Sequence, residues 1–190
     1  MKKEKYKIKV KNIFKHFHTI NKHRFKVFIL CCRVGIPIQG LVHDLSKYSK
    51  EEFIESVRYY EGIRSPIKKC KEVEGYSKAW LHHKGRNKHH YEYWYDYNLE
   101  NPTPTIPFKY VLEMICDTFA AGMTYQGKNW TKEYQLSYWN KVKEEAQMKE
   151  EIKELLTTVY EKVATTSLKE GLNKKYIKDL YQKLVIDKEE

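Results

Sequence analysis

The sequence has 190 residues, of which 41% are hydrophobic and 32% are charged, and its net charge is +11. This composition fits one globular domain with a sizeable core, and it excludes collagen, a long coiled coil and a disulfide-stabilised miniprotein. The longest uncharged apolar run, residues 27–32, is far shorter than the ~20 residues of a membrane span, and the N-terminus has no apolar signal region. We therefore expect a cytoplasmic protein with no membrane partner.

The positive charge is concentrated at the start of the chain. Residues 1–26 contain ten Lys or Arg and one Glu, whereas residues 141–190 contain equal numbers of basic and acidic side chains. A basic arm attracts polyanions, so it indicates contact with nucleic acid or with a phosphorylated substrate. The alternative is a solvated helix face, because the sequence has no RNA-binding signature, zinc finger or Gly-rich phosphate loop.

Helical periodicity dominates the first half of the chain. An apolar stripe at helical spacing runs through residues 23–34, and a short helix is expected at residues 41–45. Ser49 and Glu52 form the pattern of a capping box, which predicts a helix over residues 49–60.

The second half of the chain shows the same periodicity. We expect a short helix at residues 77–84, a proline-rich surface loop at 98–107, and a helix that starts at Pro107 and ends near residue 122. Apolar stripes at 152–163 and 177–184 predict two further helices. Because no segment alternates like a strand, the predicted fold class is all-α.

Polar residues interrupt the apolar faces of these helices at three places. His23 heads the first stripe, His43 and Asp44 are adjacent within a short apolar segment, and Asp117 is the only charge within residues 114–127. Taken singly, each fits an ordinary core histidine or a paired carboxylate. Together they form a set of imidazole and carboxylate donors that suits Fe, Mn, Zn or Co, and a buried carboxylate requires such a partner.

A second cluster of polar residues occupies positions 82–90. Four histidines and three cations lie within these nine positions: His82, His83, Lys84, Arg86, Lys88, His89 and His90. One interpretation takes the first two histidines as further metal ligands, followed by a loop whose cations bind phosphate. The alternative is a basic surface turn with solvated imidazoles.

An upstream His, an adjacent His-Asp pair and a later Asp on a buried helix resemble the HD superfamily of metal-dependent phosphohydrolases. Residues 43–47, His-Asp-Leu-Ser-Lys, are similar to that family's H-D-[IL]-G-K variant. His82 and His83 resemble the double His of the HD-GYP branch. Residues 106–117 resemble that branch's I-P-x₈-A-D helix, with the same interval of ten residues between Pro and Asp.

Three longer blocks strengthen the resemblance. The segments GLVHDLSKYS, GYSKAWLHHKGRNKHHYEYW and TYQGKNW are similar to a family of small, uncharacterised bacterial and phage proteins grouped with the HD superfamily. Some of those proteins are labelled catalase, but nothing in this sequence indicates a haem site. The resemblance covers about residues 13–135. It departs from the HD-GYP branch because the G-Y-P signature is absent.

The resemblance implies an HD-domain-like helical bundle with extra C-terminal helices. Residues 1–140 would form the metal-binding helical domain with its basic arm, and residues 141–190 would pack on the same domain. One or two divalent ions of Mn, Fe, Co, Ni or Zn are implied. The implied metal ligands are His23, His43, Asp44, His82, His83 and Asp117.

The resemblance also implies the remaining roles. Asp44 and Lys47 would be catalytic. The expected substrate-binding residues are Lys84, Arg86, Lys88, His89 and His90. No histidine lies between Asp44 and His82, where two-ion HD enzymes place a ligand, so either His89 or His90 substitutes or the site holds one ion. If His23 faces solvent, the upstream ligand is His16 or His18.

The predicted activity is hydrolysis of a phosphomonoester or phosphodiester, with a nucleotide favoured as the substrate. Two alternatives stay open at this point. One is a di-iron oxygenase of the HD type. The other is a non-catalytic module that binds nucleic acid through the basic arm and keeps a structural metal site. The sequence does not indicate an oligomeric state.

Overall fold

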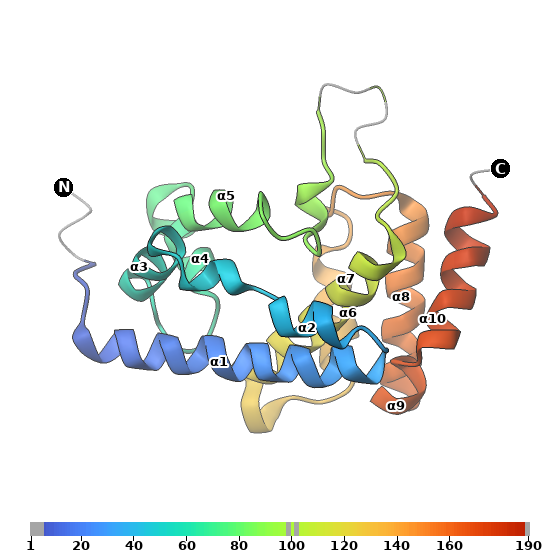
Figure 1. Ribbon diagram of the computed structural model, residues 1–190, viewed down its shortest axis with the longest axis horizontal. Coiled ribbons are helices and arrows are strands. Elements are labelled where there is room, and N and C mark those ends of the chain that lie inside the picture. The colour runs from blue at the N-terminus through green and yellow to red at the C-terminus, as the bar shows by residue number, and fades with distance from the viewer. Residues whose placement is uncertain (1–5, 98–99, 101–102, 189–190) are drawn as a thin grey trace.

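The computed structural model describes residues 6–97, 100 and 103–188. Every regular element in these residues is helical, which confirms the predicted all-α class (Figure 1). The α-helices are α1 (Val10–Arg33), α2 (Pro37–Val42), α3 (Lys50–Arg58), α4 (Pro66–Glu74), α5 (Lys78–Lys84), α6 (Phe108–Gln126), α7 (Tyr134–Val142), α8 (Glu150–Thr165), α9 (Leu168–Gly171) and α10 (Lys174–Tyr181). A single π-turn, Gln182–Ile186, continues α10. No helix in this part of the chain is both long and apolar enough to cross a bilayer.

Among the described residues, helices α1 and α6 pack against each other more extensively than any other pair of helices. In Figure 1, α3, α4 and α5 lie towards the end of the molecule where α1 begins, and α8, α9 and α10 lie towards the other end. Residues of α1, α6, α8 and α10 share one apolar core, so the C-terminal helices pack against the helices that begin the chain. The six stripe residues of α8 are all buried, as the periodicity predicted: Ile152, Leu155, Leu156, Val159, Tyr160 and Val163.

Helix α2 lies close against α1 because residue 40 is glycine. A Cβ atom on Gly40 would lie 2.6 Å from Cβ of Cys31 and 3.0 Å from Cα of Phe28, so no larger residue fits at this crossing without a shift. The short helix that the sequence predicted at residues 41–45 lies earlier in the chain, at Pro37–Val42. Pro37 occupies the first turn of α2, which ends at Val42, and the chain leaves the helix before the His-Asp pair.

The predicted end of one helix needs correction, and some helices were not predicted. Helix α6 continues past Gly122 to Gln126, because Gly122 packs closely under Trp130 and Tyr134, where a Cβ atom would lie within 3.2 Å of both side chains. Helices α4, α7 and α9 were not predicted. Helix α4 buries two residues and α9 is four residues long, so neither shows a period. Helix α7 has several apolar residues, but its two buried positions are Gln135 and Trp139. Part of the predicted loop at 98–107, residues 98–99 and 101–102, lies outside the described residues, as do residues 1–5 of the basic arm.

Candidate metal centre

Four polar side chains from three segments meet between α1 and α6. His23 comes from the middle of α1, Asp117 from the middle of α6, and His43 and Asp44 from the turn after α2. One donor atom from each lies within 4.8 Å of all the others. The structure thus brings together the four residues that the sequence singled out, and their role as ligands stays a prediction.

The spacing of these donors suits one metal ion. Nε2 of His23 lies 3.0 Å from Oδ1 of Asp117. Nε2 of His43 lies 3.2 Å from Oδ2 of Asp44 and 3.4 Å from Nε2 of His23. Ligands bound at ~2.1 Å in a tetrahedral arrangement would lie ~3.4 Å apart, which is close to these separations.

The backbone at Asp44 explains how adjacent residues reach the same point. Asp44 adopts the left-handed conformation (φ 55°, ψ 26°) between α2 and a 3₁₀ turn at Leu45–Tyr48. Neighbouring side chains on a regular helix diverge by ~100°, so His43 and Asp44 converge only because the helix has ended. A non-glycine residue in this region is strained, and such strain is typical of functional sites.

A second group of donors surrounds the other oxygen of Asp44. Oδ1 of Asp44 lies 3.2 Å from Nε2 of His83 and 3.4 Å from Nε2 of His89. Nε2 of His90 lies 2.9 Å from Nε2 of His83, and donor atoms of these four residues lie within 4.8 Å of one another. Asp44 therefore belongs to both groups and offers one oxygen to each.

This arrangement corrects the expected order of the histidines at positions 82–90. His89 and His90, predicted as an outer pair that binds substrate, lie in the second donor group. His82, predicted as a ligand, belongs to neither group, because its direction on α5 differs from that of His83 and its Nδ1 lies 2.7 Å from Glu52. The turn after α5 folds back, and this return places the later pair beside Asp44.

Two buried glutamates orient the imidazoles. Oε1 of Glu113 lies 2.8 Å from Nδ1 of His43 and 3.0 Å from Nδ1 of His89, and Oε2 of Glu52 lies 2.8 Å from Nδ1 of His83. A carboxylate that accepts the Nδ1 proton leaves the Nε2 lone pair free, and each of these Nε2 atoms faces a donor group. Neither glutamate was predicted from the sequence to orient a histidine.

Signals for the two glutamates were present in the sequence. Glu113 lies four residues before Asp117 and so shares its face of α6. Glu52 was assigned to a capping box, and half of that box is present, since Oγ of Ser49 accepts a hydrogen bond from the Glu52 amide. The Glu52 carboxylate, however, turns to His82 and His83 instead of back to Ser49.

The charges of the site sustain one another. Burial would raise the pKa of Asp44 and Asp117, but the neighbouring histidines, and for Asp44 also Lys47, hold both pKa values well below their usual range. Burial also opposes ionisation of Glu113, yet hydrogen bonds from His43 and His89 lower its pKa to about 2. All three carboxylates are therefore negatively charged at neutral pH.

The donor set fits a metal. Both carboxylate oxygens of Asp44 and Nε2 of His89 are buried and, apart from ion-pair contacts, have no hydrogen-bond partner. Buried polar atoms are seldom left without a partner in folded proteins. Neutral imidazole and carboxylate are the ligands of Zn, Fe and Mn, so one ion in each group would satisfy these atoms.

Lys47 lies at the edge of the first donor group. Its Nζ is 2.6 Å from Oδ2 of Asp44, and the side chain lines a cavity of about 140 Å³ together with His23 and Asp117. Burial would lower the pKa of Lys47, but the charges of Asp44 and Asp117 raise it, so the lysine stays protonated. It therefore presents a positive charge to whatever enters this cavity.

The other predicted phosphate-binding cations are placed differently. Of the described residues that line the cavity, Lys47 is the cation, and Lys84, Arg86 and Lys88 are not among them. Nζ of Lys88 instead lies 5.6 Å from the ring centre of Tyr93. The loop itself does contact the site, because Nδ2 of Asn87 donates a hydrogen bond of 2.8 Å to Oγ of Ser46.

The alternative upstream ligands are not needed. His16 is buried against the rings of Phe53 and Tyr60, with ring centres 5.4 and 5.5 Å away, and His18 is exposed. Burial and the charge of Lys47 lower the pKa of His16 to about 4. His16 is thus neutral, and it lines the same cavity as His23.

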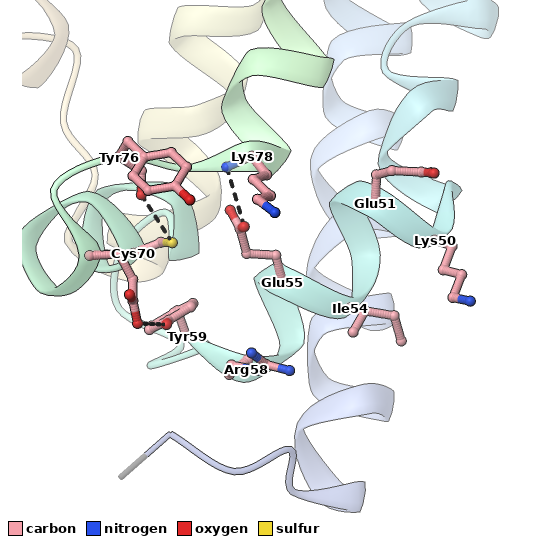
Figure 2. Close-up of a pocket in the computed structure, with 10 residues that line it drawn as sticks. Lys50, Glu51, Ile54, Glu55, Arg58, Tyr59, Cys70, Tyr76 and Lys78 are labelled. Carbon is pink, nitrogen blue, oxygen red and sulfur yellow. Dashed lines mark hydrogen bonds between the residues drawn. The ribbon is translucent and has the colours of Figure 1, made fainter. Parts of the chain in front are cut away.

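A second cavity, of about 420 Å³, is separate from this chemistry (Figure 2). It lies beside α3 and α4 and has none of the clustered histidines in its lining. Two of its three acidic residues have partners: Glu55 accepts hydrogen bonds from the start of α5, and Tyr59 donates one of 2.6 Å to Glu74. The candidate site is therefore the donor cluster between α1 and α6.

Comparison with known proteins finds a match to a family model. Residues 12–162 match the model of one family, described as a family of unknown function (DUF5662), and this segment contains both donor groups. No curated protein and no solved structure matches the chain.

Proposed function

Since the chain belongs to DUF5662, a family of unknown function, we propose that it is a metal-dependent phosphohydrolase with a two-ion centre of the HD type. One observation carries the proposal. Both oxygens of Asp44 are buried, and each lies among the donor atoms of a different group: Oδ2 beside His43 and Oδ1 beside His83. A carboxylate in this position is suited to bridge two ions, an arrangement used to cleave phosphate esters.

The remaining residues of the site would serve that chemistry. Bound ions supply a Lewis acid for a phosphoryl oxygen and lower the pKa of water. Lys47 lines the adjoining cavity as a protonated amine and would neutralise charge on the substrate phosphate. Asp117, at the border of the first donor group and the cavity, would orient the attacking water. The substrate that these charges favour is a phosphomonoester or phosphodiester.

A second candidate function uses the same donors. Clusters of histidine and carboxylate with a bridging Asp also suit a pair of iron ions, so an HD-type di-iron oxygenase is the alternative. The third possibility, a nucleic-acid-binding module, would use the basic side chains of the N-terminal arm and need no turnover. Metal analysis and activity separate the three.

The test begins with untagged protein purified without chelators. We expect about two transition-metal ions per chain, and metal-dependent release of nitrophenol from p-nitrophenyl phosphate or its bis-ester. Chelation should abolish the activity, and a single added metal should restore it. Oxygen consumption without phosphate-ester cleavage would contradict the proposal in favour of the oxygenase. Metal-free protein that binds nucleic acid with a steep salt dependence would contradict both enzymatic functions.

A further inference from the structure

Two cavities meet at Asp117. The cavity of about 140 Å³ beside the first donor group and a cavity of about 360 Å³ between α6 and α7 share four lining residues. These shared residues are Ser65, Asp117, Ala121 and Tyr125. Three of the four follow one face of α6 at intervals of four residues, so a molecule with one end at the metal centre can extend along this helix into the larger cavity.

The larger cavity has aromatic walls. Tyr125 of α6 and Tyr134 and Tyr138 of α7 line it, and Gly122 lies between them without a side chain. The rings of Tyr134 and Tyr138 are nearly parallel, with an angle of 15° and ring centres 6.4 Å apart. Flat aromatic walls of this kind suit a planar ring, which stacks on them whatever its exact chemistry.

One polar side chain in this lining has no partner. Gln135 is 1% exposed, and neither its amide nitrogen nor its amide oxygen has a hydrogen-bond partner. By contrast, Gln126, which lines the same cavity, donates a hydrogen bond of 3.1 Å to the hydroxyl of Tyr134. A buried amide with both atoms unpaired destabilises the fold, unless a ligand supplies the missing donor and acceptor.

We propose that the cavity between α6 and α7 binds the planar ring of the substrate and that Gln135 hydrogen-bonds the edge of that ring. The ring would be a nucleobase, because every base presents a donor beside an acceptor on its edge, and a carboxamide matches that pair in either order by rotating. The substrate is then a nucleotide with its phosphate at Asp117. This assignment rests on the proposed function for the phosphate end, whereas the ring pocket itself needs no metal.

The test measures nucleoside binding, since a nucleoside has the ring but no phosphate to cleave. Isothermal titration of the purified protein with uridine, cytidine, adenosine and guanosine should show binding of at least one nucleoside. Gln135→Met keeps the length of the side chain and removes both hydrogen-bonding atoms. We expect this variant to bind at least about tenfold more weakly, and its melting temperature to stay equal or rise, because no amide is left unpaired.

Two further variants keep the test decisive. Tyr138→Ala changes a side chain that is 47% exposed, so the fold should tolerate it, and the loss of stacking should weaken binding several-fold. Gln147→Met makes the same chemical change at an exposed glutamine outside the cavity and should leave binding unchanged. Nucleoside affinities that Gln135→Met and Tyr138→Ala leave untouched, or no binding of any nucleoside, would overturn the assignment.

Failure of the ring pocket and failure of the proposed function give different results. If p-nitrophenyl phosphate is cleaved but no nucleoside binds, the ring pocket is refuted and the phosphohydrolase stands. If a nucleoside binds through Gln135 but no phosphate ester is cleaved, the ring pocket is supported and the phosphohydrolase is refuted.

Discussion

Helix α6 contacts different kinds of side chain on the side that faces α8 and on the side that faces α1. Where α6 packs against α8, the contacts are apolar, and the hydroxyls of Thr118 and Tyr160 pair with each other at 3.2 Å. Where α6 faces α1 and the turn after α2, imidazoles and carboxylates are buried together, and both oxygens of Asp44 lie among histidines. The first region is an ordinary apolar core, and the second gathers donor atoms that could hold metal ions.

This difference suggests a separation that experiments can test: the apolar region stabilises the fold, and the proposed function belongs to the donor groups. Burial of apolar surface stabilises the C-terminal helices whatever is bound. Burial of several carboxylates beside the histidines opposes folding unless cations offset the charge. Substitutions in the two regions should therefore change different measurements, and the following experiments test that separation.

The largest effect is expected at Asp44, the residue shared by both donor groups. Asp44→Asn should remove both ions and lower phosphate-ester cleavage by more than about a thousandfold, because the amide cannot bridge two cations. Asp117→Asn removes a donor from the first group only, so it should leave about one ion per chain. Elemental analysis checks both variants, with Asp179→Asn on α10 as the matched control. Equal metal content in the two variants would contradict the bridging role.

The next effect belongs to the apolar region. Leu156, on α8, is 1% exposed in the shared core, and Leu156→Ala should lower the free energy of unfolding by about 3 kcal/mol. Urea denaturation measures this change. The metal content and the activity of the folded fraction should match those of the wild type. Loss of metal from the folded variant would mean that the two regions are not separable.

A smaller effect is expected at Glu113, which positions His43 and His89. Glu113→Gln keeps the shape of the side chain but weakens its hold on the two Nδ1 protons. Metal affinity should fall about 10- to 100-fold, as is typical when a carboxylate behind a histidine ligand is changed. Competition with a chromophoric chelator measures the affinity. Glu161→Gln, at an exposed position on α8, should have no effect, and an unchanged affinity at Glu113 would contradict the positioning role.

The smallest effect concerns pH and His16. Its pKa falls from the ordinary value of 6.5 to about 4, because of burial first and the charge of Lys47 second. The folded protein therefore binds this proton less readily than the unfolded chain. Stability that is present above pH 6.5 should be lost as the pH falls towards 4, by about 2 kcal/mol at pH 5.

Comparison of the wild type with His16→Phe isolates this contribution. Phenylalanine fits the packing against Phe53 and Tyr60 but does not titrate. The stability difference between the two proteins should shift by about 2 kcal/mol in favour of the variant between pH 7.5 and pH 5. If the free energies of unfolding of the two proteins change equally with pH over this range, His16 is not the group whose protonation destabilises the fold.

Much of the helical framework was predictable because apolar stripes report directly on buried faces. The apolar stripes located α8 and the second half of α1, and the proline at position 107 located the start of α6. Helix α4 could not be found in this way, since most of its residues are exposed or half-buried and its sequence is rich in lysine. Periodicity fails where a helix contributes little to the core.

The membership of the first donor group was predictable, and that of the second was predictable only in part. Polar residues on apolar faces singled out His23, His43, Asp44 and Asp117, because burial of such groups is costly and conspicuous. The second donor group contains His89 and His90 and not His82. This outcome depends on how the chain turns after α5, and no local sequence pattern specifies that turn. The left-handed backbone at Asp44 was equally hidden, because its side chain is not one that requires this conformation.

The geometry of the candidate metal centre also depends on Gly40, a residue that has no metal-binding side chain. Helix α2 can approach α1 this closely because Gly40 has no side chain. His43 and Asp44 follow three and four residues later, directly after α2. A search of related sequences by ligand residues alone would accept chains in which a bulkier residue 40 holds α2 away from α1. The diagnostic for an intact centre in such sequences is thus the donor set together with a glycine three positions before the His-Asp pair.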